Sequence, residues 1–404
     1  MRGGAENLQS ATRAALRVAS RKGQVEVFVR QAQAWQLMRD RRGGEVRRET
    51  RELGVACRVQ RGELLGFGAA SGEAASAGEV AARLALCSLG PGHTPLPEPG
   101  VLGAVPTPPP QLLTPETLEA LFHRLDREGW GGPLGVSLHR TQTLLARGEG
   151  FEACWQNQLL LAEWEEELVP GVVGRFSRVL PHPAANLAPS WRQLLPGQHR
   201  GGGFFGKRHL ARVLLAPDVA APLLVSLVRS LPHLAAPVSP AWELADLRLA
   251  PFSLLPMACD GEGRPAQDTP LLVHLALARR RELAPLPPPV RLTWERPPQP
   301  APVHLWQKSS GETVEQALAL LDRGFVALAP ASEVSVDHHG RLQLLAVMGE
   351  VRDGRPREWG VGVLGGTLRR LLSGLSATPG PEEHVALGCI VTTPWLLAKH
   401  LEVS

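Results

Sequence analysis

Proline is concentrated in a few stretches of this 404-residue chain, and these stretches limit where regular structure can form. Residues 91–110 contain eight prolines and three glycines, a composition through which neither a helix nor a strand propagates. Residues 181–206 form a second break that ends near three consecutive glycines. We therefore predict two domains, one over residues 1–205, with the proline-rich loop at about 91–110 inside it, and one over residues 206–404.

The first domain begins with helical spacing and continues with strand alternation. Apolar residues between Leu8 and Ala19 repeat every three to four positions, and Gly23 is a typical helix stop. Valines at 25, 27 and 29 alternate as in a strand, and Ala34–Met38 is interpreted as the returning strand. Three further elements follow: a strand over 53–60, a strand over 64–69 after a turn at Gly62, and an alanine-rich helix over 76–86.

Past the proline-rich loop, Thr114-Pro115-Glu116 has the pattern of a helix start. Residues 136–144 and 154–168 are strand candidates, although a helix over 158–168 fits equally well. The first half therefore predicts helices packed on a strand meander.

The second half is predicted to be rich in sheet. A strand over 211–215 precedes a buried helix that contains Leu223 and Leu231, in which Pro222 is tolerable only within the first turn. Short strands with turns follow, interrupted by helices over 313–321 and near 368–375. The fold class that we predict is α+β, with an N-terminal helix and strand-meander domain and a sheet-rich C-terminal domain.

Composition excludes several classes of protein. The chain is 44% hydrophobic and 20% charged, which is too apolar for a mainly disordered protein. The net charge of +4 is spread among interleaved acids, so the arginine-rich run Arg39–Arg51 is better explained as a solvated strand edge than as a nucleic-acid groove. The five cysteines are far apart, and the N-terminus lacks an apolar leader, so we expect reduced thiols in a soluble cytoplasmic protein.

Motif searches give no catalytic residue, no cofactor and no metal ligand. No H-E-x-x-H or G-x-S-x-G pattern occurs, and the adjacent His338 and His339 are expected in a turn. Residues 201–208 approach a phosphate-binding loop, but Arg208 occupies the position that needs a hydroxyl, and no apolar strand leads in.

Three segments, in matching order, resemble the TldD/PmbA family, once described as modulators of DNA gyrase. Residues 54–68 resemble its GVGVRV…G…GFA segment, residues 258–265 its Asp-Glu-Gly turn, and residues 388–403 its closing strand. The motif residues that carry the resemblance are Gly54, Arg58, Gly62, Gly66, Asp260, Glu262, Gly263 and Cys389. Gly263 is expected at the left-handed position of its turn.

The resemblance implies half of a two-subunit zinc metallopeptidase that acts on unfolded peptides. Catalytic members carry His-Glu-x-x-x-His on the helix after the strand at 211–215, and a cysteine ligand near the C-terminus. Here the corresponding window is Val225–Ser230, without an imidazole or carboxylate, and Cys389 stands alone at the cysteine position. The chain therefore resembles the non-catalytic PmbA/TldE type, and whether it is an enzyme is left uncertain.

We expect this chain to contribute cavity wall and a partner interface, as a homodimer or as a heterodimer with a TldD-like catalytic subunit. The alternative is a stand-alone binding or scaffold protein of the same fold without peptidase activity. Neither nucleic acid nor membrane is expected as a partner. The candidate interface residues are four aromatics that could anchor an interface: Phe204, Phe205, Trp306 and Trp395.

Overall fold

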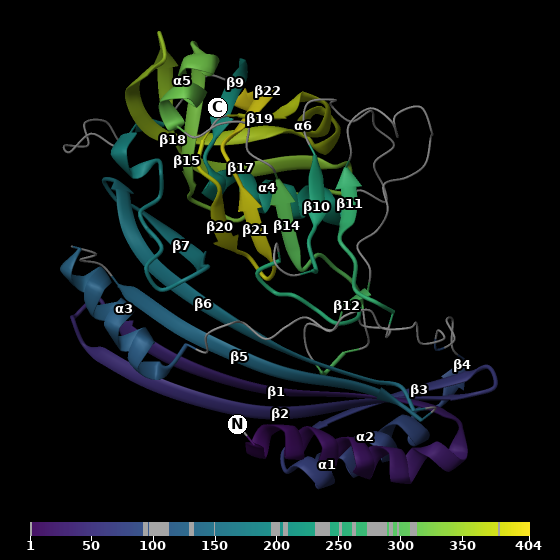
Figure 1. The fold of residues 1–404 in the computed structure, drawn as a ribbon. Helices are drawn as coiled ribbons and strands as arrows, with labels where there is room; N and C mark the ends of the chain where they lie inside the picture. Colours follow the sequence, from purple (N-terminus) through teal and green to yellow (C-terminus); the bar gives the residue numbers. More distant parts are fainter. Residues whose placement is uncertain are drawn as a thin grey trace.

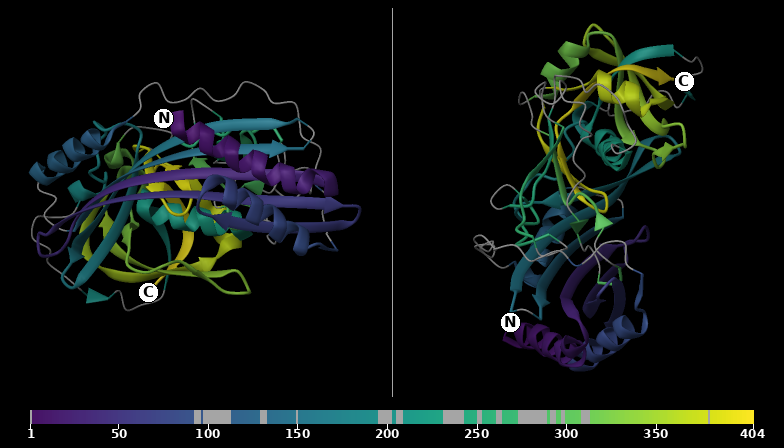
Figure 2. Two further views of the ribbon diagram at one scale, coloured as in Figure 1. Left: turned by 90° about the horizontal axis from the view of Figure 1, so that it is seen from below. Right: turned by 90° about the vertical axis from the view of Figure 1, so that its right-hand side faces the viewer.

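The computed structural model describes the following residues: 2–91, 96, 113–128, 133–148, 150–194, 203–204, 209–230, 243–249, 253–260, 264–272, 289–290, 294–296, 299–307, 313–378 and 380–404. A long curved sheet forms the lower part of the molecule in Figure 1, and a more compact body with the C-terminus lies above it. Figure 2 shows the same division from two other directions, with helices α1 and α2 on the side of the long sheet away from the body. Helices pack on sheets throughout, which confirms the α+β fold class.

The helices within the described residues are α1 (Arg2–Ala19), α2 (Ala74–Cys87), α3 (Pro115–Arg127), α4 (Pro217–Ser230), α5 (Val314–Leu321) and α6 (Leu368–Gly374), with short 3-10 turns η1 (Ser20–Lys22) and η2 (Arg192–Leu194). The predicted helices at the N-terminus, after Thr114, over 313–321 and near 368–375 are all present. Thr313 and Thr367 cap α5 and α6 by accepting hydrogen bonds from backbone amides of the first turn.

The first sheet has the order β11-β10-β14-β21-β20-β7-β6-β5-β1-β2-β3-β4. Its strands are β1 (Gln24–Arg39), β2 (Glu45–Arg61), β3 (Leu64–Ser71), β4 (Gly90–Pro91), β5 (Leu134–Arg147), β6 (Glu152–Val169), β7 (Val172–Leu180), β10 (Leu244–Asp246), β11 (Thr269–Leu272), β14 (His304–Gln307), β20 (Glu383–Ala386) and β21 (Ile390–Thr393). The sheet therefore takes strands from both sides of the boundary that we predicted after residue 205.

The second sheet has the order β16-β17-β15-β9-β22-β18-β8, and β17 also pairs with β18. Because of that extra pairing, β17, β15, β9, β22 and β18 close into a barrel. Its strands are β8 (Gly203–Phe204), β9 (His209–Leu215), β15 (Gly324–Pro330), β16 (Ser335–Val336), β17 (Arg341–Arg352), β18 (Arg355–Thr367), β19 (Leu375–Ala377), which pairs with β22, and β22 (Leu396–Val403). A separate pair is formed by β12 (Pro289–Val290) and β13 (Gln299–Pro300).

Two expectations from the sequence need correction, and one open choice is settled. Ala34–Met38 is not a returning strand, because β1 continues to Arg39 and turns only at Asp40, whose Oδ1 accepts hydrogen bonds from the backbone amides of Arg42 and Gly44 at 2.8 Å each. The open choice over residues 158–168 is settled as strand, within β6. Pro222 lies beyond the first turn of α4, which begins at Pro217, so the expectation that it is tolerable only within the first turn is wrong. Having no amide hydrogen, it cannot donate to the Asp218 carbonyl oxygen, and the helix continues without that bond.

Side chains of α4 connect the two sheets. Its buried residues pack in one cluster with Val213 and Phe325 of the barrel and with Leu305 and Val391 of the first sheet. Helices α1 and α2 bury their small side chains on the opposite end of the first sheet, around Val27 and Cys57. The fold therefore places α4 at the junction of the two sheets (Figure 1).

Candidate functional site

The α4 junction is the candidate functional site, because the zinc-binding motif of the resembling family is expected there. Within the window Val225–Ser230, Val225, Leu227 and Val228 are buried among apolar neighbours. The two serines of α4, Ser226 and Ser230, are one turn apart and partly buried. The Ser226 hydroxyl donates to the Pro222 carbonyl oxygen and the Ser230 hydroxyl to the Ser226 carbonyl oxygen, each at 2.9 Å. Both hydroxyls therefore donate to carbonyl oxygens of α4 itself.

Cys389 lies beside this window, as the resemblance implies. It is partly buried against the same apolar cluster as α4, and both Arg229 and Asp246 are near enough to act on its thiol electrostatically. Burial, and then the Asp246 carboxylate, raise the pKa of the Cys389 thiol to about 12, against the opposing charge of Arg229. At neutral pH this cysteine is a protonated thiol and a poor nucleophile.

A buried ionic network fixes the first turn of α4. Asp218 accepts hydrogen bonds from the Arg178 guanidinium, one of them at 2.6 Å, and from the Trp191 indole at 2.8 Å. Arg178 also pairs with Glu383, which accepts from the Ser190 backbone amide at 2.9 Å. Burial disfavours the guanidinium charge, but Asp218 and Glu383 outweigh that cost and raise the pKa of Arg178. This network ties α4 to β7 and β20.

Two histidines converge on one threonine on the opposite face of strands β14, β21 and β20. His304 Nε2 and His384 Nδ1 each lie 2.7 Å from the Thr392 hydroxyl. His304 Nδ1 accepts from the Leu254 backbone amide at 3.2 Å, so Nε2 carries the proton and donates to Thr392, whose hydroxyl proton is then directed to His384. The order of donors and acceptors requires both imidazoles to be neutral.

Electrostatics favour the same neutral state. Burial, and then the neighbouring His384, lower the pKa of His304 to about 4. Burial also lowers the pKa of His384, with Glu382 opposing and Arg178 reinforcing the shift. Because the facing nitrogens are engaged with Thr392, this pair is explained as a polar brace across three strands.

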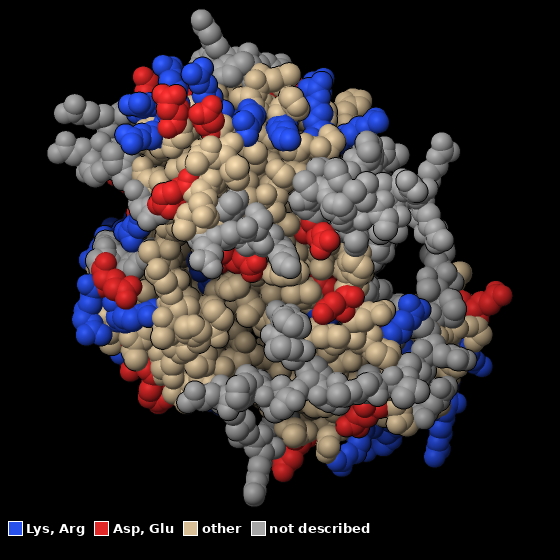
Figure 3. All heavy atoms as spheres, turned by 45° about the horizontal axis from the view of Figure 1, so that its top comes forward, with Lys and Arg blue, Asp and Glu red and all other residues tan. Residues whose placement is uncertain are grey.

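No metal centre is evident in the part of the chain that the structure describes. Within those residues no group of three or more histidine, cysteine, aspartate or glutamate side chains is placed to hold an ion. Nor is any helix among them long and apolar enough to cross a membrane. On the face shown in Figure 3, basic side chains lie mainly around the border with acidic ones among them, and further acidic side chains lie nearer the middle of the face.

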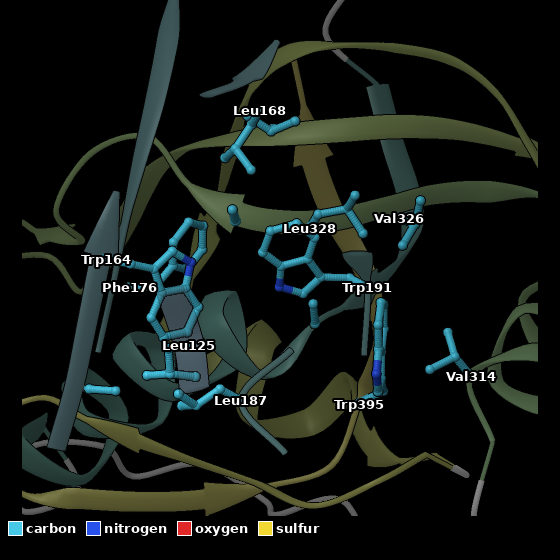
Figure 4. Close-up of a cluster of buried hydrophobic side chains, with 14 of the residues drawn as sticks. Leu125, Trp164, Leu168, Phe176, Leu187, Trp191, Val314, Val326, Leu328 and Trp395 are labelled. Carbon is cyan, nitrogen blue, oxygen red and sulfur yellow. The ribbon is translucent and has the colours of Figure 1, made fainter. Parts of the chain in front are cut away.

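The candidate interface aromatics do not share one environment. Trp395 is 0% exposed and lies in the core beside Trp191 (Figure 4), with its indole donating to the Ser190 hydroxyl at 2.8 Å. Its assignment to an interface is therefore wrong, because an aromatic at a strand end can equally pack inward. Trp306 is half-buried, and its indole donates to Glu382 at 3.3 Å, so it stays a candidate. Phe204 lies in β8, where its side chain is not described, and Phe205 lies outside the described residues.

The glycine-rich motif residues have close packing or turn roles. A Cβ on Gly54 would lie 2.1 Å from the Trp294 indole, and one on Gly66 would lie 1.9 Å from the Ala85 carbonyl oxygen of α2. Gly62 has a φ of 60° in the turn between β2 and β3. Arg58 is buried and donates to both oxygens of Glu26, at 2.9 and 3.0 Å.

The predicted Asp-Glu-Gly turn is described only at its two ends. Asp260 is buried, and its backbone amide donates to the Arg264 carbonyl oxygen at 2.8 Å. Cys259 and Pro265 form an antiparallel bridge, so the chain does reverse between them. Glu262 and Gly263 lie outside the described residues, and the left-handed glycine stays a prediction.

Sequence reasoning missed the two polar clusters around α4 and β21. Arg178 and Glu383 are 205 residues apart, and His304 and Thr392 are 88 residues apart. No local spacing pattern joins residues at such separations, so nothing in the sequence alone could have paired them.

Comparison with known proteins supports the same architecture. No family model and no curated protein sequence matches the chain. Among solved structures, TldE from Thermococcus kodakarensis is similar at a TM-score of 0.76 and 15% identity, covering 98% of this chain and 100% of that one. A putative modulator of DNA gyrase from Thermotoga maritima gives 0.73 and 15%, with 98% and 100% covered. A second putative modulator, from Bacteroides thetaiotaomicron, gives 0.68 and 12%, with 100% and 99% covered. The resemblance to TldD/PmbA proteins is thus confirmed at the level of the fold, over nearly the whole chain.

Proposed function

We propose that this chain is a non-catalytic, TldE-like subunit that assembles with a TldD-type zinc metallopeptidase acting on unfolded peptides in the cytoplasm. The observation that carries the proposal is the state of α4. Where a catalytic chain would present two imidazoles and a carboxylate, this helix buries Val225, Leu227 and Val228 and closes its two serine hydroxyls on itself. Cys389, beside it, is held as a thiol.

The surroundings of α4 support a structural role for this junction. The Arg178 network fixes the helix start, and the histidine pair braces the strands behind it. Neither cluster leaves a free base positioned for bound water. The likeness to TldE from Thermococcus kodakarensis, over 98% of this chain, supports the same interpretation.

Two measurements test the proposal. Elemental analysis of the purified chain should give well under one zinc per chain after dialysis against a weak chelator, whereas about one retained zinc would contradict it. The chain alone should not cleave unfolded peptides, and adding a TldD-type subunit from the same genome should yield a stable complex with chelator-sensitive cleavage. Absence of any association at tens of micromolar would instead favour the stand-alone binding protein.

A further inference from the structure

The first half of strand β2 is an open edge of the long sheet. Residues 45–52 are exposed on both faces, whereas the second half of the strand is mostly buried. β3 pairs with β2 only from Gly54 onward, so among the described strands residues 45–53 pair with β1 alone. Figure 1 shows β2 extending along the border of the sheet well beyond the end of β3. A free edge of this length is a template for another strand.

Alternate residues of this edge direct their backbone groups outward. The Leu53 carbonyl oxygen accepts from the Gly72 amide at 3.2 Å, on the side away from β1. In an antiparallel strand the amide and carbonyl of one residue point to the same side, and residues two apart repeat that direction. The outward backbone groups therefore belong to Glu45, Arg47, Glu49 and Arg51.

The side chains of these same four residues alternate in charge along one face of the strand. Antiparallel pairing of β2 with a second copy of itself, centred on residue 48, places Glu45 opposite Arg51 and Arg47 opposite Glu49, each twice by symmetry. Every outward backbone group would then meet an outward backbone group of the other copy. The pattern is self-complementary.

Neighbouring registers are worse. Centring on residue 49 places Glu49 opposite its own copy and Arg47 opposite Arg51. Centring on residue 47 places Arg47 opposite its own copy and Glu45 opposite Glu49, twice by symmetry. Centring on residue 50 needs the Leu53 carbonyl oxygen, which is already engaged with Gly72. Among centres 47 to 50, charge and backbone accounting thus favour residue 48.

We propose that two copies of this chain associate through this edge, as an antiparallel β2–β2 pair centred on Arg48 that joins two long sheets into one. Existing contacts of the edge, such as Arg47 with Glu119 at 2.5 Å, are exposed surface pairs and are exchanged at little cost. The inference stands apart from the proposed function, because it uses neither α4 nor a metallopeptidase partner.

Charge exchange tests the register with the chain itself. In sedimentation equilibrium, Glu49→Arg should raise the dimer dissociation constant by about tenfold or more, since two attractive pairs become two Arg–Arg pairs. Arg47→Glu combined with Glu49→Arg restores both pairs and should return the constant to near the wild-type value. Glu63→Arg makes the same charge change on the exposed turn after β2 and should leave the constant unchanged.

A further variant distinguishes this register from general electrostatic attraction. Arg48 lies on the other face and would meet its own copy at the symmetry axis, so Arg48→Thr should tighten the dimer. A wild-type chain that is monomeric at about 100 µM would overturn the proposal. So would a Glu49→Arg chain that dimerises normally, or a double exchange that associates no better than Glu49→Arg alone.

Discussion

Replacing Asp218 by asparagine removes the central charge of the network that holds α4. Asp218 is 4% exposed and accepts from both Arg178 and Trp191. An asparagine of the same shape keeps one acceptor but turns an NH₂ donor toward groups that are themselves donors. Arg178 is then left with Glu383 as its charge partner, in a site where both side chains of the original pair are about 95% buried.

The expected cost follows from that burial. Removing one partner of a buried ion pair costs about 3 to 5 kcal/mol, because the remaining charge is left in a poorly solvating site. Glu383 still offsets part of the Arg178 charge, so we expect the lower end, about 3 kcal/mol. Urea unfolding followed by tryptophan fluorescence at pH 7 measures it, and Trp191 is one of the ten tryptophans that contribute to the signal.

A matched control uses a surface pair on the same strand. Arg175 and Glu165 form an ion pair at 2.9 Å, but the arginine side chain is 82% exposed. Arg175→Gln should therefore cost less than about 0.5 kcal/mol. If Asp218→Asn costs less than about 1 kcal/mol, or no more than Arg175→Gln, the network does not hold the helix in the way described.

Three further predictions follow from described contacts. The pKa of His304 is about 4 in the folded chain and about 6.5 in the unfolded chain, so between pH 7 and pH 4 the unfolded chain binds more protons. The free energy of unfolding should therefore fall by up to about 3 kcal/mol as the pH drops from 7 to 4. His304→Gln should flatten that slope, and an unchanged slope would contradict the neutral histidine pair. Gly66→Ala should lower the free energy of unfolding by about 2 kcal/mol or more, because the new Cβ would clash with the Ala85 carbonyl oxygen. Gly148→Ala should be nearly neutral, because no atom lies within 4 Å of a Cβ placed there. Equal melting temperatures of the two variants would contradict the close packing of Gly66 on α2. The Cys389 thiol should react with a disulfide reagent at pH 8 at least about tenfold more slowly than exposed Cys87, and comparable rates would show that Cys389 is not held as a buried thiol.

Local patterns predicted the elements whose determinants are local. The alternation around Val55 and Val59, the turn at Gly62 and the alanine-rich helix after it all form as expected. The end of β1 was mispredicted because a turn was assumed between Val29 and Ala34, where the chain has no Gly, Pro, Asn or Asp; the turn lies instead at Asp40.

The sequence could predict where the candidate site lies but not the polar contacts around it. The resemblance located the α4 window and Cys389, and the structure brings them together. The Asp218 and Thr392 clusters depend on pairing between distant strands, which composition and spacing do not encode. The burial of Trp395 could not be predicted for the same reason, because whether an aromatic at a strand end is buried depends on what distant parts of the chain pack against it.

The continuity of the first sheet across the whole chain has a consequence for the order of folding. Strand β7 finds its neighbour β20 only after about 200 further residues have been made, as the 205-residue separation of Arg178 and Glu383 shows. At roughly 5 to 20 residues per second, the ribosome leaves that edge without its partner for about 10 to 40 s. During this interval the edge of β7 lacks its later neighbour, and Arg178, whose partner Asp218 follows only 40 residues on, still lacks Glu383. The sheet begun by the first half of the chain is thus extended by strands made about 200 residues later, and until then that edge can pair with other chains.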